Sequence, residues 1–301
     1  MSSVTCGICG APATAAFVAT DRNRRLSEDR FTYYRCTSCR TLQLVPVPAD
    51  LGRYYTAEYY AVPDDRGALV AASGAERYKL ELIRPLVPAG RLVEVGPAVG
   101  GFAAVMQDAG YETSAIEMDA DCCRFLREVV GVPVQETDDP VQALAVGAPF
   151  DVVAMWHVIE HLPNPREVLA AAAAALAPGG IIALAAPNPD AAQFRLLRSR
   201  WTHLDAPRHL ALIPPTALTQ LGRELGLEVV VTTTRDAGTI GWNRFGWRES
   251  LAGFARGRYP RFALRLAGSA LARAMQPLDR REGRGSTYTV VLRRPLHGAA
   301  G

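Results

Sequence analysis

The stretch Leu92-Val-Glu-Val-Gly-Pro-Ala-Val-Gly-Gly-Phe102 reads as a short apolar strand that runs into a glycine-rich turn. Around it, apolar periodicity predicts helices over 76–86, 102–109 and 121–130, and strands over 91–95 and 112–117. This alternation predicts an α/β fold with a doubly wound, mostly parallel sheet covered by helices. Ligands of such sheets bind at the carboxyl ends of the strands, where this turn lies.

Two acidic residues beside the turn narrow the choice of ligand. Glu117 ends the second predicted strand, 21 residues after Gly96, where a carboxylate can accept hydrogen bonds from ribose hydroxyls. Gly96 and Gly100 let the backbone pass close to a ligand. Glu94 lies just before the turn and would repel a pyrophosphate, so it argues against a dinucleotide and favours a cationic ligand.

Three stretches carry a resemblance to a known family: VEVGPAVGG at 93–101, AIEMD at 115–119 and FDVVAMWHVIEHL at 150–162. They resemble motifs of the class I S-adenosylmethionine-dependent methyltransferases, in the subgroup that includes ubiquinone-biosynthesis O-methyltransferases and many glycan-modifying enzymes. The resemblance spans about residues 76–235, with a last strand at 288–292. It implies a Rossmann-like fold, S-adenosylmethionine as cofactor, and cofactor contacts from Glu94, Gly96, Gly100, Glu117, Met155, Trp156 and His157.

The chain departs from the family's glycine turn at one position. Ala98 stands where the family has its middle glycine, so we expect weaker cofactor binding or a slightly displaced turn. His157 and His161 lie four residues apart and could share a helical face. Without a third ligand in the sequence, they do not predict a metal site.

Four of the six cysteines form two CxxC pairs, Cys6/Cys9 and Cys36/Cys39, separated by 26 residues. Four thiolates at this spacing suit a tetrahedral, structural Zn²⁺ site with no open position for water. Strands at 16–19 and 30–35 would complete a zinc-ribbon-like module, and disulfides or redox thiols are the alternative. An aromatic cluster at 53–60 could cover a cleft.

The segment that begins at Pro187, after a strand predicted at 181–185, is expected to reach over the methyl group and to differ most among relatives. It holds Trp201-Thr-His-Leu-Asp-Ala-Pro-Arg-His209. Either His203 or His209 could remove a proton from a hydroxyl acceptor, while Arg208 and Trp201 could bind the acceptor. The alternative is that these residues brace a lid through hydrogen bonds.

The predicted organisation is therefore a zinc-ribbon-like module at 1–50, a linker or cap at 51–75 and a class I methyltransferase domain at 76–301. Within the last, we expect an acceptor-side insertion at about 187–215 and a basic helical region at about 244–285. Twelve arginines lie between residues 244 and 294, and a basic amphipathic helix at 259–275 could rest on a membrane surface. A helix packed on the sheet is the alternative.

The length, composition and net charge of the chain limit the locations and partners that we expect. Its 301 residues, 49% of them hydrophobic, can bury a full α/β core. No apolar run reaches the roughly 18 to 20 residues of a membrane span, and the N-terminus lacks the pattern of a signal peptide, so we expect a cytoplasmic protein. The net charge of +3 does not favour a nucleic-acid partner.

The preferred function is methyl transfer to a small or lipid-linked hydroxylated acceptor, first of all a sugar or glycan precursor. O-methylation is favoured over C-methylation. Two alternatives remain: an RNA methyltransferase in which zinc assists substrate binding, and an inactive zinc-ribbon interaction protein. The sequence does not predict the oligomeric state.

Overall fold

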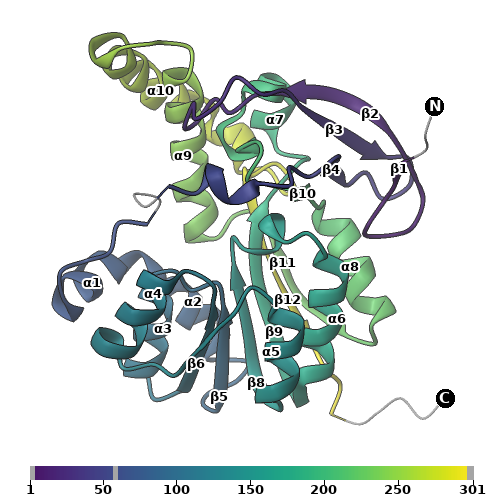
Figure 1. The fold of residues 1–301 in the computed structure, drawn as a ribbon, viewed down its shortest axis with the longest axis vertical. Coiled ribbons are helices and arrows are strands. Elements are labelled where there is room, and N and C mark those ends of the chain that lie inside the picture. Colours follow the sequence, from purple (N-terminus) through teal and green to yellow (C-terminus); the bar gives the residue numbers. More distant parts are fainter. Residues whose placement is uncertain (1–3, 57–59, 297–301) are drawn as a thin grey trace.

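The computed structural model describes residues 4–56 and 60–296, which fold around two sheets (Figure 1). The larger sheet has seven strands in the order β11-β12-β9-β8-β5-β6-β7. Its strands are β5 (Arg91–Val95), β6 (Glu112–Glu117), β7 (Val134–Glu136), β8 (Phe150–Trp156), β9 (Leu176–Pro187), β11 (Glu228–Thr233) and β12 (Thr287–Arg293). Neighbours are parallel except at β12, which is antiparallel to both β9 and β11. The predicted doubly wound, mostly parallel α/β fold is confirmed.

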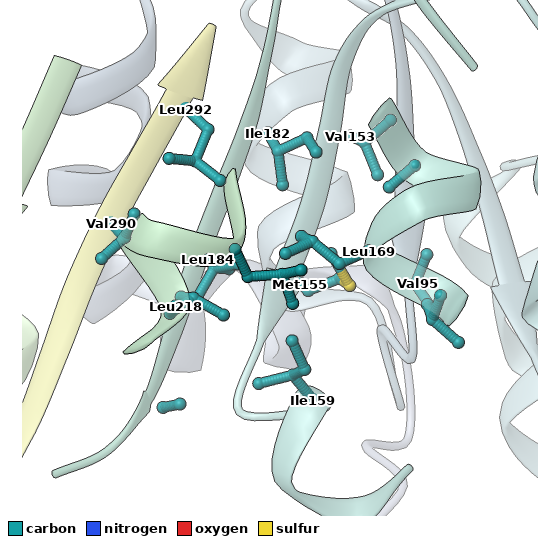
Figure 2. Close-up of a cluster of buried hydrophobic side chains, with 14 of the residues drawn as sticks. Val95, Val153, Met155, Ile159, Leu169, Ile182, Leu184, Leu218, Val290 and Leu292 are labelled. Atoms are coloured by element: carbon teal, nitrogen blue, oxygen red, sulfur yellow. The ribbon is translucent and has the colours of Figure 1, made fainter. Parts of the chain in front are cut away.

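Helices cover both faces of this sheet because its strands are apolar on both sides. The helices of one face are α1 (Arg66–Ala72), α2 (Arg77–Ile83), α3 (Gly101–Asp108) and α4 (Ala120–Phe125), and those of the other are α5 (Pro140–Gly147), α6 (Pro165–Ala175) and α8 (Pro215–Glu224). Val153 and Met155 of β8 pack with Leu169 of α6 and Leu218 of α8 (Figure 2). Trp156, the next residue along β8, packs on the opposite face with Phe102 of α3.

The smaller sheet is antiparallel, with the order β1-β2-β3-β4-β10. Its strands are β1 (Val4–Thr5), β2 (Pro12–Ala19), β3 (Phe31–Cys36), β4 (Leu42–Leu44) and β10 (Ala211–Leu212). The predicted strands at 16–19 and 30–35 fall within or beside β2 and β3. β10 comes from the segment expected to lie over the methyl group, so the two predicted regions share one sheet.

The smaller sheet lies at the carboxyl end of β8 (Figure 1). The Leu210 amide, just before β10, donates a hydrogen bond of 2.7 Å to the Glu160 carbonyl in the short helix η4 (Ile159–His161) that follows β8. A second core joins this sheet to the acceptor-side segment, with Phe31 and Tyr33 of β3 packed near Phe194 and Trp201. The N-terminal strands therefore cover the end of the larger sheet at which a ligand would bind.

Several elements differ from their predicted form. The helix expected at 121–130 begins at Ala120 and continues after Phe125 as a π-helical turn, η3 (Leu126–Val130). The segment 187–215 contains α7 (Ala192–Leu197) and the single turns η5 (Arg198–Arg200) and η6 (Thr202–Leu204). Two short helices, η1 (Leu51–Tyr54) and η2 (Ser73–Glu76), flank the part of the predicted cap that includes residues 57–59, which lie outside the described residues.

A pair of helices, α9 (Ala237–Ala252) and α10 (Arg258–Asp279), connects β11 to β12 and projects beyond the sheet (Figure 1). α10 includes the basic helix expected at 259–275 and packs along α9 as a hairpin. None of the helices in 4–56 and 60–296 is long and apolar enough to cross a membrane. The predicted division at residues 50, 75 and 76 stays a prediction.

Candidate functional site

The glycine turn after β5 has the backbone shape that its sequence suggests. Gly96, Ala98 and Gly100 all have positive φ, at 64°, 51° and 80°. A side chain at Gly96 would meet Val158, because its Cβ would lie 2.8 Å from Val158 Cγ2. Ala98 takes the left-handed conformation that glycine adopts more easily, at some cost in strain. The departure at Ala98 is therefore accommodated without loss of the turn's conformation.

Glu117 reaches from the end of β6 to this turn. Its Oε2 accepts a hydrogen bond of 3.0 Å from the Ala98 amide, and its Oε1 accepts bonds from the Met118 and Asp119 amides at 2.8 and 2.9 Å. The carboxylate is thus fixed beside the glycine turn by three backbone donors. The structure brings together the acid and the turn that the spacing paired.

Glu94 is buried before the turn, with Oε2 lacking a hydrogen-bond partner among the described residues. Burial raises the pKa of Glu94 to about 8, and the charge of Lys79 opposes this increase. The Lys79 ammonium is paired with Glu76 and lies 4.7 Å from the centroid of the Trp156 ring. A cationic ligand beside Glu94 would therefore stabilise the charged form of its buried carboxyl group.

Lys79 was missed as a site residue. It is the only lysine of the chain and lies in the helix directly before β5, which is the one signal that the sequence offers. Its side chain is almost fully buried, an unusual environment for a lysine. Lys79 thus contributes a fixed positive charge between Glu76, Glu94 and the Trp156 ring.

The three residues predicted from the end of β8 do not share one environment. Met155 is fully buried in the core beside α6 and α8 (Figure 2), which differs from its expected place in a cofactor cleft, because successive strand residues face opposite sides of a sheet. Trp156 lies on the other face, near Phe102 and Lys79. His157 has a φ of 58°, and its Nδ1 lies 3.5 Å from Glu160 Oε1. Strained backbone of this kind is enriched at functional sites.

Beyond β8, Glu160 meets two histidines from different parts of the chain. One ligand atom each from Glu160, His161 and His209 lies within 4.8 Å of the others. Glu160 is 1% exposed, and neither carboxylate oxygen has a hydrogen-bond partner within the described ranges. Burial raises its pKa, whereas the nearby histidines oppose that increase.

Each histidine of this cluster is oriented by a backbone carbonyl. His161 Nδ1 lies 3.1 Å from the Arg208 carbonyl, and His209 Nδ1 lies 2.8 Å from the His203 carbonyl. Because a carbonyl only accepts, both rings carry the proton on Nδ1 and leave Nε2 as a lone pair. Burial lowers the pKa of both rings, to about 4 for His161, and keeps them neutral at pH 7.

Two neutral imidazoles and one carboxylate have the chemistry of a divalent-cation site or of a general base. The sequence did not identify this cluster, because it paired His161 with His157 and found no third ligand. His209 is the missing partner, brought from 48 residues away by the turn before β10. Only the tertiary structure reveals that contact.

The other predicted acceptor-side residues are largely buried. His203 Nε2 lies 3.1 Å from the Trp242 carbonyl of α9, and Trp201 Nε1 donates to Gln193 Oε1 at 3.1 Å. The Arg208 guanidinium is fully buried. It pairs with Asp21 at 2.6 Å and Asp205 at 2.9 Å, one carboxylate from each predicted region. Arg208 and Trp201 are both buried and join elements of the protein. Their predicted contacts with the methyl acceptor stay predictions.

The aromatic segment after β4 also reaches this region. The Tyr55 hydroxyl lies 3.0 Å from His161 Nδ1, and the Tyr54 carbonyl accepts a bond of 3.3 Å from Arg208 Nη1. These contacts place the segment over the histidine cluster. Part of the predicted aromatic cluster, including Tyr59, lies outside the described residues.

The four predicted zinc ligands form a second cluster, made of thiols instead of the imidazoles and carboxylate of the first. Their sulfur atoms all lie within 4.8 Å of one another, with Cys6 and Cys39 at 3.6 Å and Cys9 and Cys36 at 3.4 Å. A tetrahedron with metal–sulfur bonds of about 2.3 Å has sulfur separations of about 3.8 Å. The four thiols are free rather than disulfide-bonded, and they fit a zinc ion closely.

Comparisons with known proteins agree with this geometry. A family model described as a methyltransferase domain matches residues 71–232, more than half of the chain. The ubiquinone biosynthesis O-methyltransferase of Bordetella avium is 28% identical over 149 residues, which cover 46% of this chain and 62% of that enzyme. The chain thus spans less than two thirds of the length of this relative.

Two further matches are broader in coverage. The protein-L-isoaspartate O-methyltransferase of Chlorobaculum parvum is 28% identical over 173 residues, or 54% of this chain and 73% of that one. The crystal structure of a putative sarcosine dimethylglycine methyltransferase from Galdieria sulphuraria aligns with a TM-score of 0.50 and 13% identity, covering 77% of this chain and 88% of that one. At this identity, the structural match concerns the fold alone.

Proposed function

Because the chain belongs to the methyltransferase-domain family, we propose that it transfers the methyl group of S-adenosylmethionine to a hydroxyl of a small or lipid-linked acceptor. One observation carries the cofactor part of this proposal. The Glu117 carboxylate is held against the Ala98 amide, at the carboxyl ends of β5 and β6. This is the place at which a doubly wound sheet presents a carboxylate to the ribose of a nucleoside.

The charged groups of S-adenosylmethionine also fit the other residues around the glycine turn. Glu94 offers a buried carboxylate to the ammonium or sulfonium, and Trp156 offers an aromatic surface. Gly96 and Gly100 give the methionine chain close access to the backbone. His157 directly follows β8, and its Nδ1 lies near Glu160, so it connects the cofactor side with the acceptor side.

The acceptor chemistry rests on His209. Its Nδ1 is occupied by the His203 carbonyl, so its Nε2 is the atom that can receive a proton. As the acceptor oxygen attacks the methyl carbon, the carbon–sulfur bond breaks and its electron pair stays on sulfur, which gives S-adenosylhomocysteine. The hydroxyl proton moves to His209 Nε2, and Glu160 stabilises the resulting imidazolium.

His203 is the weaker candidate for the base. Its Nε2 is bound to the Trp242 carbonyl, and its own carbonyl orients His209. We therefore assign His203 a positioning role. Alignment of acceptor, methyl carbon and sulfur supplies part of the rate in addition to any base.

The acceptor class is the finer part of the proposal. The relatives named O-methyltransferases support oxygen as the nucleophile. A sugar or glycan precursor remains our first choice, because the neutral histidines and Glu160 suit a weakly acidic hydroxyl. Carbon methylation is the second choice.

We further propose that Cys6, Cys9, Cys36 and Cys39 hold a structural Zn²⁺ ion. Four sulfur ligands fill its tetrahedron and leave no position for substrate. Its effect would be to fix the loops at one end of the smaller sheet. Cys6 and Cys36 belong to the same apolar cluster as Val93 of β5, so the bound ion would also stabilise the contact between the two sheets.

Calorimetric titration with S-adenosylmethionine tests the cofactor site. We expect Glu117→Ala to weaken binding about tenfold, or about 1.4 kcal/mol, and Glu112→Ala to change it by less than about twofold. Glu112 is the matched control because it begins the same strand and is exposed. Absence of binding to the unaltered protein would favour the inactive interaction protein.

Transfer of labelled methyl groups tests the acceptor. The unaltered protein is incubated with labelled S-adenosylmethionine and separate pools of hydroxylated sugars, lipid-linked sugars, phenols and RNA. Label in the sugar pools supports the proposal. Label in RNA alone would replace it with the nucleic-acid alternative.

A further inference from the structure

Outside the methyl-transfer site, the hairpin of α9 and α10 contains a cleft of about 560 Å³. The two helices approach closely at Gly268, where a Cβ would lie 2.6 Å from the Cα of Arg248. Away from this crossing, the first half of α9 and the second half of α10 leave space between them. Ile240 and Asn243 of α9 face Ala272 and Gln276 of α10 across that space.

Arginines from both helices line the cleft. Arg244 and Arg248 lie one turn apart on α9, Arg273 lies on α10, and Arg280 is the residue that follows α10. The four cations come together only because α9 packs against α10, since two of them belong to α9 and two to α10 or its C-terminal end. Arg244 and Arg248 are like charges at i and i+4, a spacing that destabilises a helix slightly.

The positive charge of the cleft is largely uncompensated. Within 4–56 and 60–296, no ion pair or side-chain hydrogen bond joins Arg244, Arg273 or Arg280 to another residue. By contrast, Glu249 pairs with Arg248 and with Arg265 on the same hairpin. Arg244, Arg273 and Arg280 share the cleft with one carboxylate, that of Asp279, and form no ion pair with it.

The floor of the cleft also provides an acceptor. Asp279 is buried, and its Oδ2 accepts a hydrogen bond of 2.7 Å from Trp247 Nε1. Its Oδ1 is buried without a hydrogen-bond partner in the described part of the chain. A ligand with a hydroxyl group could satisfy this oxygen while its anionic group meets the arginines.

We infer that this cleft binds the phosphate or diphosphate group of a hydroxylated molecule. A guanidinium group can donate two parallel hydrogen bonds to two oxygens of one phosphate. Several unpaired cations in a concave surface also strengthen the electrostatic potential that attracts an anion. The site is separate from the proposed methyl-transfer cluster. It does not depend on the proposed function.

The test is calorimetric titration of the full chain with inorganic pyrophosphate at low salt. We expect submillimolar binding that the double variant Arg244→Ala/Arg273→Ala weakens at least about tenfold. The matched control is Arg256→Ala/Arg281→Ala, which removes two exposed arginines outside the cleft. Circular dichroism of both variants establishes that they fold.

Sedimentation with phosphatidylglycerol vesicles distinguishes the two sources of phosphate. Pyrophosphate binding that depends on the cleft, without vesicle binding, identifies a soluble phosphate ester. Vesicle binding that the cleft variant loses and the control keeps identifies a lipid headgroup. The inference is overturned when neither probe binds, or when both double variants reduce binding equally.

Discussion

The two sides of the proposed active site are built in different ways. On the cofactor side, β5, the glycine turn, β6 and Glu117 lie within 27 consecutive residues, and one hydrogen bond between Glu117 and Ala98 closes the arrangement. On the acceptor side, Asp21, Glu160 and His209 come from three distant segments. A nearly continuous segment can therefore specify a cofactor site, whereas the acceptor site requires the smaller sheet to be docked.

Removal of the proposed zinc ion is the largest perturbation we expect, and it should affect the two sides unequally. With Cys36→Ser or a strong chelator, the smaller sheet loses several kcal/mol of stability, because zinc binding to four thiolates contributes about 10 kcal/mol or more. Hydrogen exchange should increase throughout 4–44 and much less in β5 and β6. Purified protein that contains no zinc and is unaffected by chelation would contradict this prediction.

Arg208→Ala should give the next largest loss of stability. It leaves Asp21 and Asp205 without their buried partner, and breaking such a pair costs about 3–5 kcal/mol. Urea unfolding measures the loss. Arg124→Ala is the matched control, since the exposed pair of Arg124 with Asp121 contributes less than about 1 kcal/mol. Equal, small effects of the two substitutions would mean that the buried network does not hold the N-terminal region against the acceptor-side segment.

His209→Ala should separate acceptor chemistry from cofactor binding. We expect kcat to fall about 100-fold or more, because a general base contributes at least this much, while the affinity for S-adenosylmethionine stays within about twofold. His203→Ala should lower kcat less than about tenfold, since the His203 carbonyl that orients His209 belongs to the backbone and is retained in the variant. Larger loss with His203→Ala than with His209→Ala would reverse the two roles.

Assays after chelation, with Mg²⁺ or Zn²⁺ added back, show whether the cluster of Glu160, His161 and His209 acts through a cation. Activity that survives chelation assigns His209 the role of a simple base. Activity that is lost while circular dichroism shows the chain still folded, and that returns with added metal, assigns the cluster the role of a ligand set, whereas loss that accompanies unfolding reflects the four-cysteine site.

Glu94→Gln should have the smallest effect at low pH, and the effect should grow as the pH rises. Burial raises the pKa of Glu94 from 4.5 to about 8, so the folded state is favoured at low pH and loses this stability as the pH rises towards 8. The variant should therefore gain stability relative to the unaltered protein between pH 5 and 9, by about 1 kcal/mol or more. Glu128→Gln, at an exposed helical position, should show no such trend. A difference in unfolding free energy that stays constant with pH would contradict the burial argument.

Protonation of Glu94 should also affect cofactor binding. A cation beside Glu94 favours its charged form, so affinity for S-adenosylmethionine should increase as the pH rises through about 8. Glu94→Gln should remove this dependence. Titrations at several pH values measure it.

The sequence by itself determined the alternation of strands and helices around β5, the glycine turn and the pairing of that turn with Glu117. These features follow from local patterns, since apolar periodicity defines strands and helices, and parallel strands bring their carboxyl ends together. The CxxC spacing likewise predicted the cluster of four thiols. Each of these signals lies within a few tens of residues.

Only the tertiary structure decided which side chains meet on the acceptor side. β10 pairs with β4 across more than 160 residues, and this pairing accompanies the approach of His209 to Glu160 and the enclosure of Arg208 between Asp21 and Asp205. It also determined that Met155 faces the core and that Lys79 lies beside the Trp156 ring. Such contacts depend on how two sheets dock, and no local period of the sequence encodes that orientation.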